Sequence, residues 1–214
     1  MRDNELDADV SARRAVAITL AEYDRVAAAY RRGTEDHDVS QNIAALLDAI
    51  EGTPPYVILD LGCGPGRDLR AFSELGHEVT GLDGSAELVA LARAASGRPV
   101  LHQDFLDLDL PPARFDGIFA NAVLFHVPSS QIGRVLADLA AALKPRGVLF
   151  SSNPRGRNEE GWVGGRYGCF YDLETWRAIA TGAGFIELYH YYRPPGRPRA
   201  EQPWLATVWR RCEG

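Results

Sequence analysis

Short apolar segments alternate with stretches of helical length along the middle of this 214-residue chain. Apolar residues in the intervening stretches recur at helical spacing, as at Leu69, Phe72 and Leu75. Strands that alternate with such helices form a parallel sheet with right-handed crossovers. We therefore predict an α/β fold with a Rossmann-like, doubly wound sheet. The five predicted strands are VILDLG (57–62), HEVTGLD (77–83), PVLHQD (99–104), FDGIFAN (115–121) and GVLFSSN (147–153).

Helical patterns precede this alternation, and two more strand patterns follow it. Residues 1–33 predict one helix, and a second helix begins after Ser40, which is a good N-cap. A helix at 172–183 and strands at 185–192 and 203–211 complete a seven-stranded sheet, mostly parallel with the last strand antiparallel.

We assign residues 1–214 to a single domain, in which the helices of 1–51 form an N-terminal lid on a core at 56–214. The Gly- and Arg-rich stretch 153–168 is too long for a simple connection, so we predict a functional loop there. The Pro-rich linker between the last two strands is predicted not to be helical.

Charge and composition narrow the classes of partner. The formal net charge of −6 argues against a duplex nucleic acid. No apolar run approaches the roughly 20 residues of a membrane span, and the N-terminus is charged, so we expect a cytoplasmic protein without a membrane partner. Three widely spaced cysteines indicate neither a disulfide framework nor a metal site. The sequence does not indicate an oligomeric state.

The loop DLGCGPG (60–66) follows the first strand of the alternation, where doubly wound sheets bind ligands. Its glycines allow a sharp turn and a close approach of the backbone to a ligand. The spacing GxGxG differs from the GxGxxG of dinucleotide enzymes, in which a helix N-terminus receives a pyrophosphate. The loop therefore favours a ligand without phosphates.

Acidic residues end the next two strands at the same edge of the sheet. Asp83 lies 23 residues after Asp60, where a carboxylate can accept hydrogen bonds from both ribose hydroxyls. Asp104 is placed to accept from an adenine amino group, with Phe105 against the ring. A helix cap or a loop turn is the alternative role for each acid taken singly.

The runs DLGCGPG, GLDGS, QDF and FxxNAVLFHV together resemble motifs of class I S-adenosylmethionine-dependent methyltransferases. This resemblance implies S-adenosylmethionine as the cofactor, a small-molecule substrate, and a glycine loop that faces the methionine part. It also matches Tyr23, Asp24, Ala27 and Tyr30 to the YDxxAxxY pattern of a helix that covers the site. The predicted cofactor-binding residues are Tyr23, Tyr30, Asp60, Gly62, Gly64, Arg67, Asp83, Gly84, Ser85, Gln103, Asp104, Phe105, Asn121 and Phe125.

A narrower resemblance spans about residues 20 to 211. Segments such as DHDVSQN (36–42), EGWVGGRYG (160–168) and QPWLATVW (202–209) are similar to the methyltransferase domain of ovothiol-biosynthesis enzymes, which methylates an imidazole nitrogen of 5-thiohistidine. This chain lacks the iron-dependent sulfoxide-synthase part of those enzymes. The resemblance implies a free-standing thiohistidine N-methyltransferase.

Such a zwitterionic substrate needs a carboxylate clamp, an acceptor for its ammonium group and a flat slot for its ring. Arg155 or Arg166 would be the clamp, because guanidinium binds carboxylate bidentately. If the reaction uses a base, His37 and His126 are the catalytic candidates. Either histidine is alternatively a structural residue. The other predicted substrate-binding residues are Asp38, Gln41, Asn42, Asn153, Trp162, Tyr167, Tyr171 and Tyr192.

Two alternatives stay open at this point. One is N-, O- or S-methylation of another small zwitterionic or acidic metabolite. The other is a nicotinamide-dependent oxidoreductase or a cofactor-binding module without catalysis. The GxGxG spacing and the lack of a Tyr-x-x-x-Lys pair disfavour the oxidoreductase, since Lys144 is the single lysine.

Overall fold

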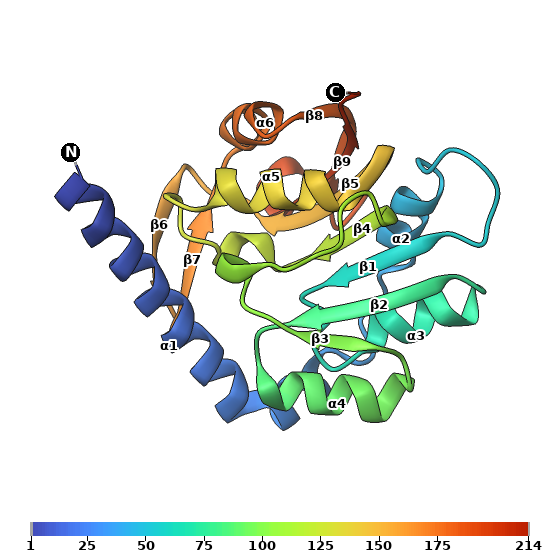
Figure 1. Cartoon of the computed structure of the whole chain (residues 1–214), viewed down its shortest axis with the longest axis horizontal. Helices are drawn as coiled ribbons and strands as arrows, with labels where there is room; N and C mark the ends of the chain where they lie inside the picture. Colours follow the sequence, from blue (N-terminus) through green and yellow to red (C-terminus); the bar gives the residue numbers. More distant parts are fainter. Residues whose placement is uncertain (1, 214) are drawn as a thin grey trace.

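The computed structural model describes residues 2–213 of the chain. Seven strands form one twisted sheet in the order β3-β2-β1-β4-β5-β9-β8, and β6 and β7 form a separate hairpin (Figure 1). The strands are β1 Val57–Leu61, β2 Glu78–Asp83, β3 Val100–His102, β4 Phe115–Asn121, β5 Leu143–Pro154, β6 Glu159–Val163, β7 Arg166–Phe170, β8 Phe185–Arg193 and β9 Trp204–Arg211. The helices are α1 Arg2–Thr34, α2 Ser40–Leu47, α3 Arg67–Glu74, α4 Ala86–Ser96, α5 Ile132–Ala142 and α6 Leu173–Gly182.

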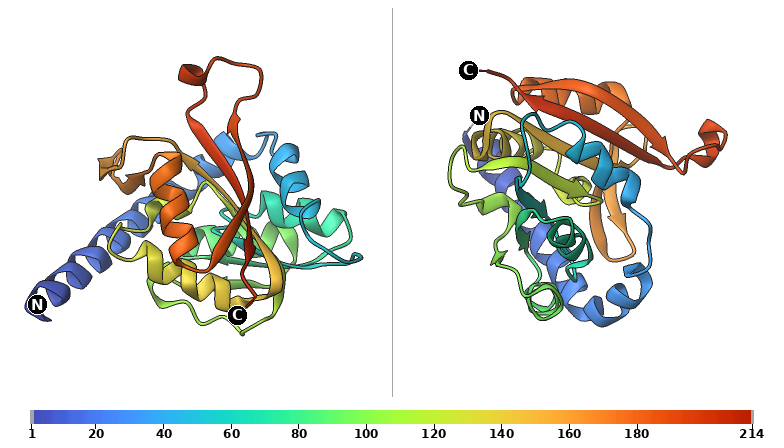
Figure 2. Two further views of the ribbon diagram at one scale, coloured as in Figure 1. Left: turned by 90° about the horizontal axis from the view of Figure 1, so that it is seen from above. Right: turned by 90° about the vertical axis from the view of Figure 1, so that its right-hand side faces the viewer.

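The predicted fold class is confirmed. Strands β1 to β5 pair in parallel, and β9 runs antiparallel to both β5 and β8. The sheet has an apolar layer on each face. Residues of α1, α5 and α6 pack in one layer, and residues of α2, α3 and α4 pack in the other (Figure 2).

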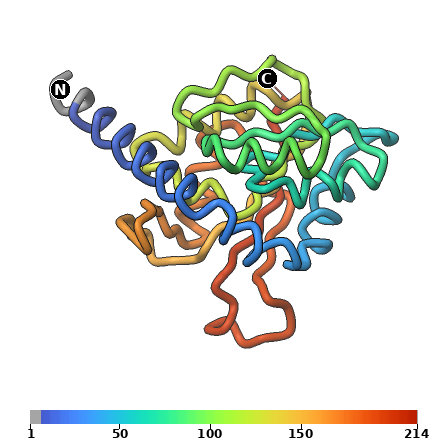
Figure 3. Tube along the Cα trace, turned by 90° about the horizontal axis from the view of Figure 1, so that it is seen from below, coloured from blue at the N-terminus to red at the C-terminus, as the bar shows by residue number. Residues whose placement is uncertain are grey.

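Helix α1 runs along the outside of the domain, and its second half lies near α4 and the β6–β7 hairpin (Figure 3). It bears apolar side chains on one side, of which Ala12 and Val16 are buried. No helix within residues 2–213 combines the length and apolar character that a membrane crossing requires.

The sequence predicted a functional loop at 153–168, but most of this stretch forms the hairpin of β6 and β7. Gly164 and Gly165 make its two-residue turn with φ of +56° and +80°, the left-handed conformations that tight hairpins require. The hairpin projects away from the main sheet and packs against α1.

Three other local features also differ from the prediction. Strand β5 begins at Leu143 instead of Gly147, because Leu143 already pairs with Phe115 of β4, and an irregularity in register separates this pair from the next, Gly117 with Val148. Ser40 is the first residue of α2 and not its cap, since its backbone N–H is already bonded to the Asp38 carboxylate. The linker 194–203 contains a short 3-10 turn at Arg199–Glu201.

Candidate functional site

The glycine loop closes over the carboxyl end of β1. Gly62, Gly64 and Gly66 all have positive φ, and the N–H groups of Gly62 and Cys63 donate to the carbonyl of Leu82. A Cβ at Gly62 would collide with the side chain of Val123. The loop therefore keeps its shape only with glycine at that position.

Asp83 is buried at the end of β2 with each carboxylate oxygen bonded to the backbone. Its Oδ2 accepts from the Gly64 N–H at 2.9 Å, and its Oδ1 accepts from the Ser85 N–H at 2.9 Å. Burial is the main cause that raises the pKa of Asp83. Each oxygen keeps a second lone pair, so the carboxylate can also accept two hydroxyl groups of a ligand.

A narrow hollow of about 50 Å³ adjoins Asp83. The apolar part of its wall comes from four parts of the chain, with Leu20 of α1, Leu88 of α4, Phe105 after β3 and Val123 after β4. An adenosine group needs apolar surfaces for its flat base and a carboxylate acceptor for its ribose hydroxyls. These residues therefore fit the adenosyl part of S-adenosylmethionine.

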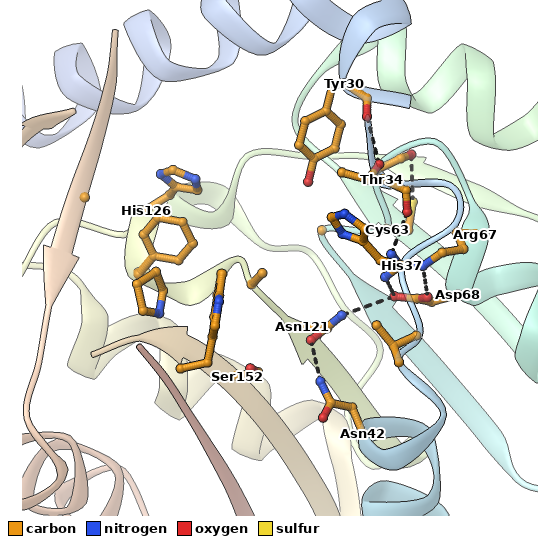
Figure 4. Close-up of a pocket in the computed structure, with 18 of the residues that line it drawn as sticks. Tyr30, Thr34, His37, Asn42, Cys63, Arg67, Asp68, Asn121, His126 and Ser152 are labelled. Atoms are coloured by element: carbon orange, nitrogen blue, oxygen red, sulfur yellow. Dashed lines mark hydrogen bonds and ion pairs between the residues drawn. The ribbon is translucent and has the colours of Figure 1, made fainter. Parts of the chain in front are cut away.

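A larger cavity of about 680 Å³ opens beside this narrow hollow (Figure 4). Figure 4 shows His126 on one side of it and His37, Arg67 and Asp68 on the other. Six residues line both hollows and so mark the junction between them, namely Tyr23, Tyr30, Gly62, Gly64, Ala122 and His126.

Arginine side chains from three elements reach the larger cavity. Arg67 is paired with Asp68, at 2.7 Å between Nε and Oδ1. Arg166 of β7 and Arg193 of β8 have no carboxylate within 4.0 Å among the described residues. Arg193 donates instead to the backbone carbonyl of Asp38. Two guanidinium groups are therefore available to an anionic ligand.

A chain of side-chain hydrogen bonds lines the floor of the cavity. The Asn42 amide donates to Asn121 Oδ1 and accepts from the Tyr191 hydroxyl, and the Asn121 amide lies 3.5 Å from Asp68. Asn42 thus has partners at both ends of its amide group, although it lines the cavity as predicted. Its placement favours a structural role over binding an ammonium group.

The two candidate bases differ in their surroundings. His37 is exposed at the cavity rim. His126 has both ring nitrogens bonded, Nε2 to the Tyr23 hydroxyl at 2.8 Å and Nδ1 to the Tyr167 carbonyl at 2.6 Å. Burial lowers the pKa of His126 to about 4, with a smaller contribution from Arg166. A weak base with both nitrogens in use suits a positioning role better than proton abstraction.

Several predicted cofactor residues have structural partners. Asp104 accepts from the Leu106 N–H and caps the turn after β3, and Gln103 bonds the backbone of Asp109 at both ends of its amide group. Asp60 is buried with Oδ2 unpartnered, and burial raises its pKa, as does the nearby Asp68. None of these three residues lines either hollow, so the structure does not bring their side chains into the site.

The structure assembles only part of the predicted substrate set. Asp38, Asn42, Arg166 and Tyr167 line the larger cavity. The others lie outside its lining because alternation along a strand or packing turns their side chains elsewhere. They are Gln41, Asn153, Arg155, Trp162, Tyr171 and Tyr192.

The aromatic and basic residues that replace them were missed from the sequence. Phe170 and Trp204 line the cavity, whereas Tyr171 and Tyr192 do not, and Arg193 lines it instead of Arg155. Period-2 alternation could have placed Phe170 on the same face of its strand as Gly168. It could not have placed Phe170 in the same cavity as Trp204, because that depends on where β7 and β9 lie in the fold.

Residues 59–151 match the family model of the methyltransferase domain. The fold is that of class I S-adenosylmethionine-dependent methyltransferases, and the fold and cofactor predicted from the sequence agree with it.

Among solved structures, the chain is similar to the 1,6-didemethyltoxoflavin-N1-methyltransferase of Burkholderia thailandensis with bound 1,6-didemethyltoxoflavin and S-adenosylhomocysteine. The TM-score is 0.76 at 24% identity, over 94% of this chain and 91% of that one.

Two curated relatives match the central part of the chain. The ubiquinone biosynthesis O-methyltransferase of Rhodopseudomonas palustris strain TIE-1 is 34% identical over 50% of this chain and 42% of its own length. The trans-aconitate 2-methyltransferase of Azoarcus sp. strain BH72 is 38% identical over 48% of this chain and 40% of its own. The chain thus spans less than half the length of these relatives.

Proposed function

We propose that the protein transfers a methyl group from S-adenosylmethionine to a small zwitterionic or acidic metabolite. The observation that carries this proposal is the junction of two hollows. One is narrow and largely apolar beside Asp83. The other is wide and is lined by Arg166 and Arg193, which have no ion-pair partner among the residues that the structure describes. The first fits an adenosyl group, and the second fits an acceptor that bears a carboxylate.

When bound, S-adenosylmethionine supplies an electrophilic methyl group. The chain contributes binding and orientation, which account for much of the rate of such transfers. Asp83 accepts the ribose hydroxyls, and the two arginines hold the acceptor. Residues of helix α1 line both hollows and residues of the β6–β7 hairpin line the larger one, so these two elements border the place from which water has to be excluded.

The specific candidate for the acceptor is 5-thiohistidine, methylated at an imidazole nitrogen. Its support is the sequence resemblance together with the composition of the cavity. Arg166 and Arg193 suit its carboxylate, Asp38 suits its ammonium group, and Phe170 and Trp204 offer flat surfaces for its ring.

Thermal unfolding with added nucleotides tests the cofactor. We expect S-adenosylhomocysteine to raise the melting temperature and NAD to leave it unchanged. A rise with NAD alone would contradict the proposal.

Mass spectrometry after incubation with S-adenosylmethionine tests the acceptor. We expect a gain of one methyl group on 5-thiohistidine and none on histidine, the matched control without the thiol. Methylation of a different acid or zwitterion would retain the reaction class and exclude thiohistidine.

A further inference from the structure

The hydrogen bonds of His126 determine which of its nitrogens carries the proton. Nδ1 lies 2.6 Å from the carbonyl oxygen of Tyr167, which can only accept, so the hydrogen is on Nδ1. The depressed pKa keeps the ring neutral at pH 7. Nε2 therefore carries a lone pair, and at 2.8 Å it must accept the hydrogen of the Tyr23 hydroxyl.

This arrangement determines whether the Tyr23 hydroxyl can donate a hydrogen bond to a ligand or accept one from it. A phenol oxygen has one hydrogen and two lone pairs. The hydroxyl donates its hydrogen to His126. Burial raises the pKa of Tyr23, so the hydroxyl stays protonated. Tyr23 and His126 both line the two hollows, and the Tyr23 oxygen bonded to His126 can act there only as an acceptor.

The Tyr23 oxygen keeps a lone pair for a ligand among the other charged and titratable groups around this pair. The guanidinium of Arg166 of β7 lies 5.0 Å from the centroid of the Tyr23 ring, and it offsets part of the rise that burial causes in the pKa of this phenol. Even if this cation takes one of the two lone pairs, the other remains. Tyr30, whose ring centroid lies 5.3 Å from that of Tyr23, is a partly buried phenol whose pKa is raised to about 12 by burial. Asp83 lines the narrow hollow together with Tyr23.

We propose that His126 is a positioning residue that turns the hydroxyl hydrogen of Tyr23 away from the junction, so that the oxygen favours a cationic sulfonium over a neutral thioether. Selectivity for S-adenosylmethionine over S-adenosylhomocysteine would then originate in this pair. The inference rests on the proposed function for the identity of the cofactor.

Calorimetric titration of both nucleosides measures this selectivity without any methyl acceptor. We expect Tyr23→Phe to lower the preference for S-adenosylmethionine about five-fold, the effect of one hydrogen bond. His126→Phe should lower it by a similar factor, and the double variant should lower it no further, because the two residues act as a unit. His126→Gln should restore the preference, since an amide can both donate to Tyr167 and accept from Tyr23.

The matched control is Tyr56→Phe, which alters another tyrosine packed on a histidine, His77, away from both hollows. It should leave the preference unchanged. An unchanged preference in Tyr23→Phe, or additive losses in the double variant, would overturn the inference alone. A wild-type protein that binds neither nucleoside would overturn the proposed function and the selectivity together.

Nitrogen-15 NMR of the histidine rings supplies a readout that is independent of binding. We expect His126 to hold its proton on Nδ1 at pH 7, with and without S-adenosylhomocysteine. A proton on Nε2 would reverse the Tyr23 hydrogen bond and overturn the inference even if the protein binds the cofactor.

Discussion

Asp83 connects the cofactor hollow to the backbone that shapes it. Its two oxygens bind the N–H groups of Gly64 and Ser85, so the carboxylate is fixed before a ligand arrives. Replacing Asp83 with Ala should weaken binding of S-adenosylhomocysteine by about 1–3 kcal/mol, because hydrogen bonds to a charged group are lost. Isothermal titration measures this change. Asp109→Asn, an exposed acid nearby, is the control, and equal losses in both variants would contradict the role of Asp83.

His126 makes stability depend on pH through its depressed pKa. Its folded pKa of about 4 lies below the ordinary value of 6.5, so the neutral ring stabilises the fold above pH 6.5. This contribution is lost as the pH falls from 6.5 to 4, because His126 binds a proton in the unfolded chain but not in the folded one.

Urea unfolding at several pH values measures the loss. Between pH 6.5 and 4, wild-type protein should lose roughly 1–3 kcal/mol more than His126→Gln, which does not titrate. Comparing the two proteins cancels the opposite effect of the buried acids Asp60 and Asp83, whose pKa values are raised. Parallel pH profiles would contradict the depressed pKa.

At the scale of elements, the Thr19 side chain connects the β6–β7 hairpin to α1 by two hydrogen bonds. The Thr19 hydroxyl donates to the Ala15 carbonyl at 2.9 Å and accepts from the Tyr167 N–H at 2.9 Å. Tyr167 in turn presents its carbonyl to His126. The threonine thereby sets the position of the hairpin over the junction.

Thr19→Val should leave the Tyr167 N–H unpaired and reduce the free energy of unfolding by about 1–3 kcal/mol. Hydrogen exchange should accelerate in 159–170 more than in the central sheet, because the hairpin is the element released. Thr53→Val, in an exposed loop, serves as the control. Uniform acceleration over the whole chain would contradict a local attachment.

At the scale of the whole molecule, Thr207 joins the sheet to the layer of α6. Its buried oxygen accepts from the indole N–H groups of Trp176 and Trp209, at 3.2 and 2.7 Å, and bonds the Ser151 hydroxyl at 2.8 Å. Thr207→Val should leave two buried donors unpaired and lower the free energy of unfolding by about 2–4 kcal/mol. Denaturant unfolding measures this loss. An effect no larger than that of the exposed Thr181→Val would contradict it.

The order of the sheet and the location of the cofactor hollow follow from local pattern. Alternating strands and helices with a glycine loop after β1 leave few topologies, and Asp83 must lie beside that loop because parallel strands end at one edge. Hairpin β6–β7 was mistaken for a loop because its glycines and arginines suggest irregular backbone, whereas Gly164 and Gly165 make a turn.

The sequence by itself determined the fold class and placed Asp83 beside the glycine loop at one edge of the sheet, because periodicity and strand ends are local properties. Only the tertiary structure decided which side chains line the larger cavity. Arg193 enters it and Arg155 does not, and Tyr23 meets His126 across 103 positions of the chain. Such pairings depend on how α1, the hairpin and β8 pack on the sheet, and that packing is a sum of many small contacts that no single motif encodes.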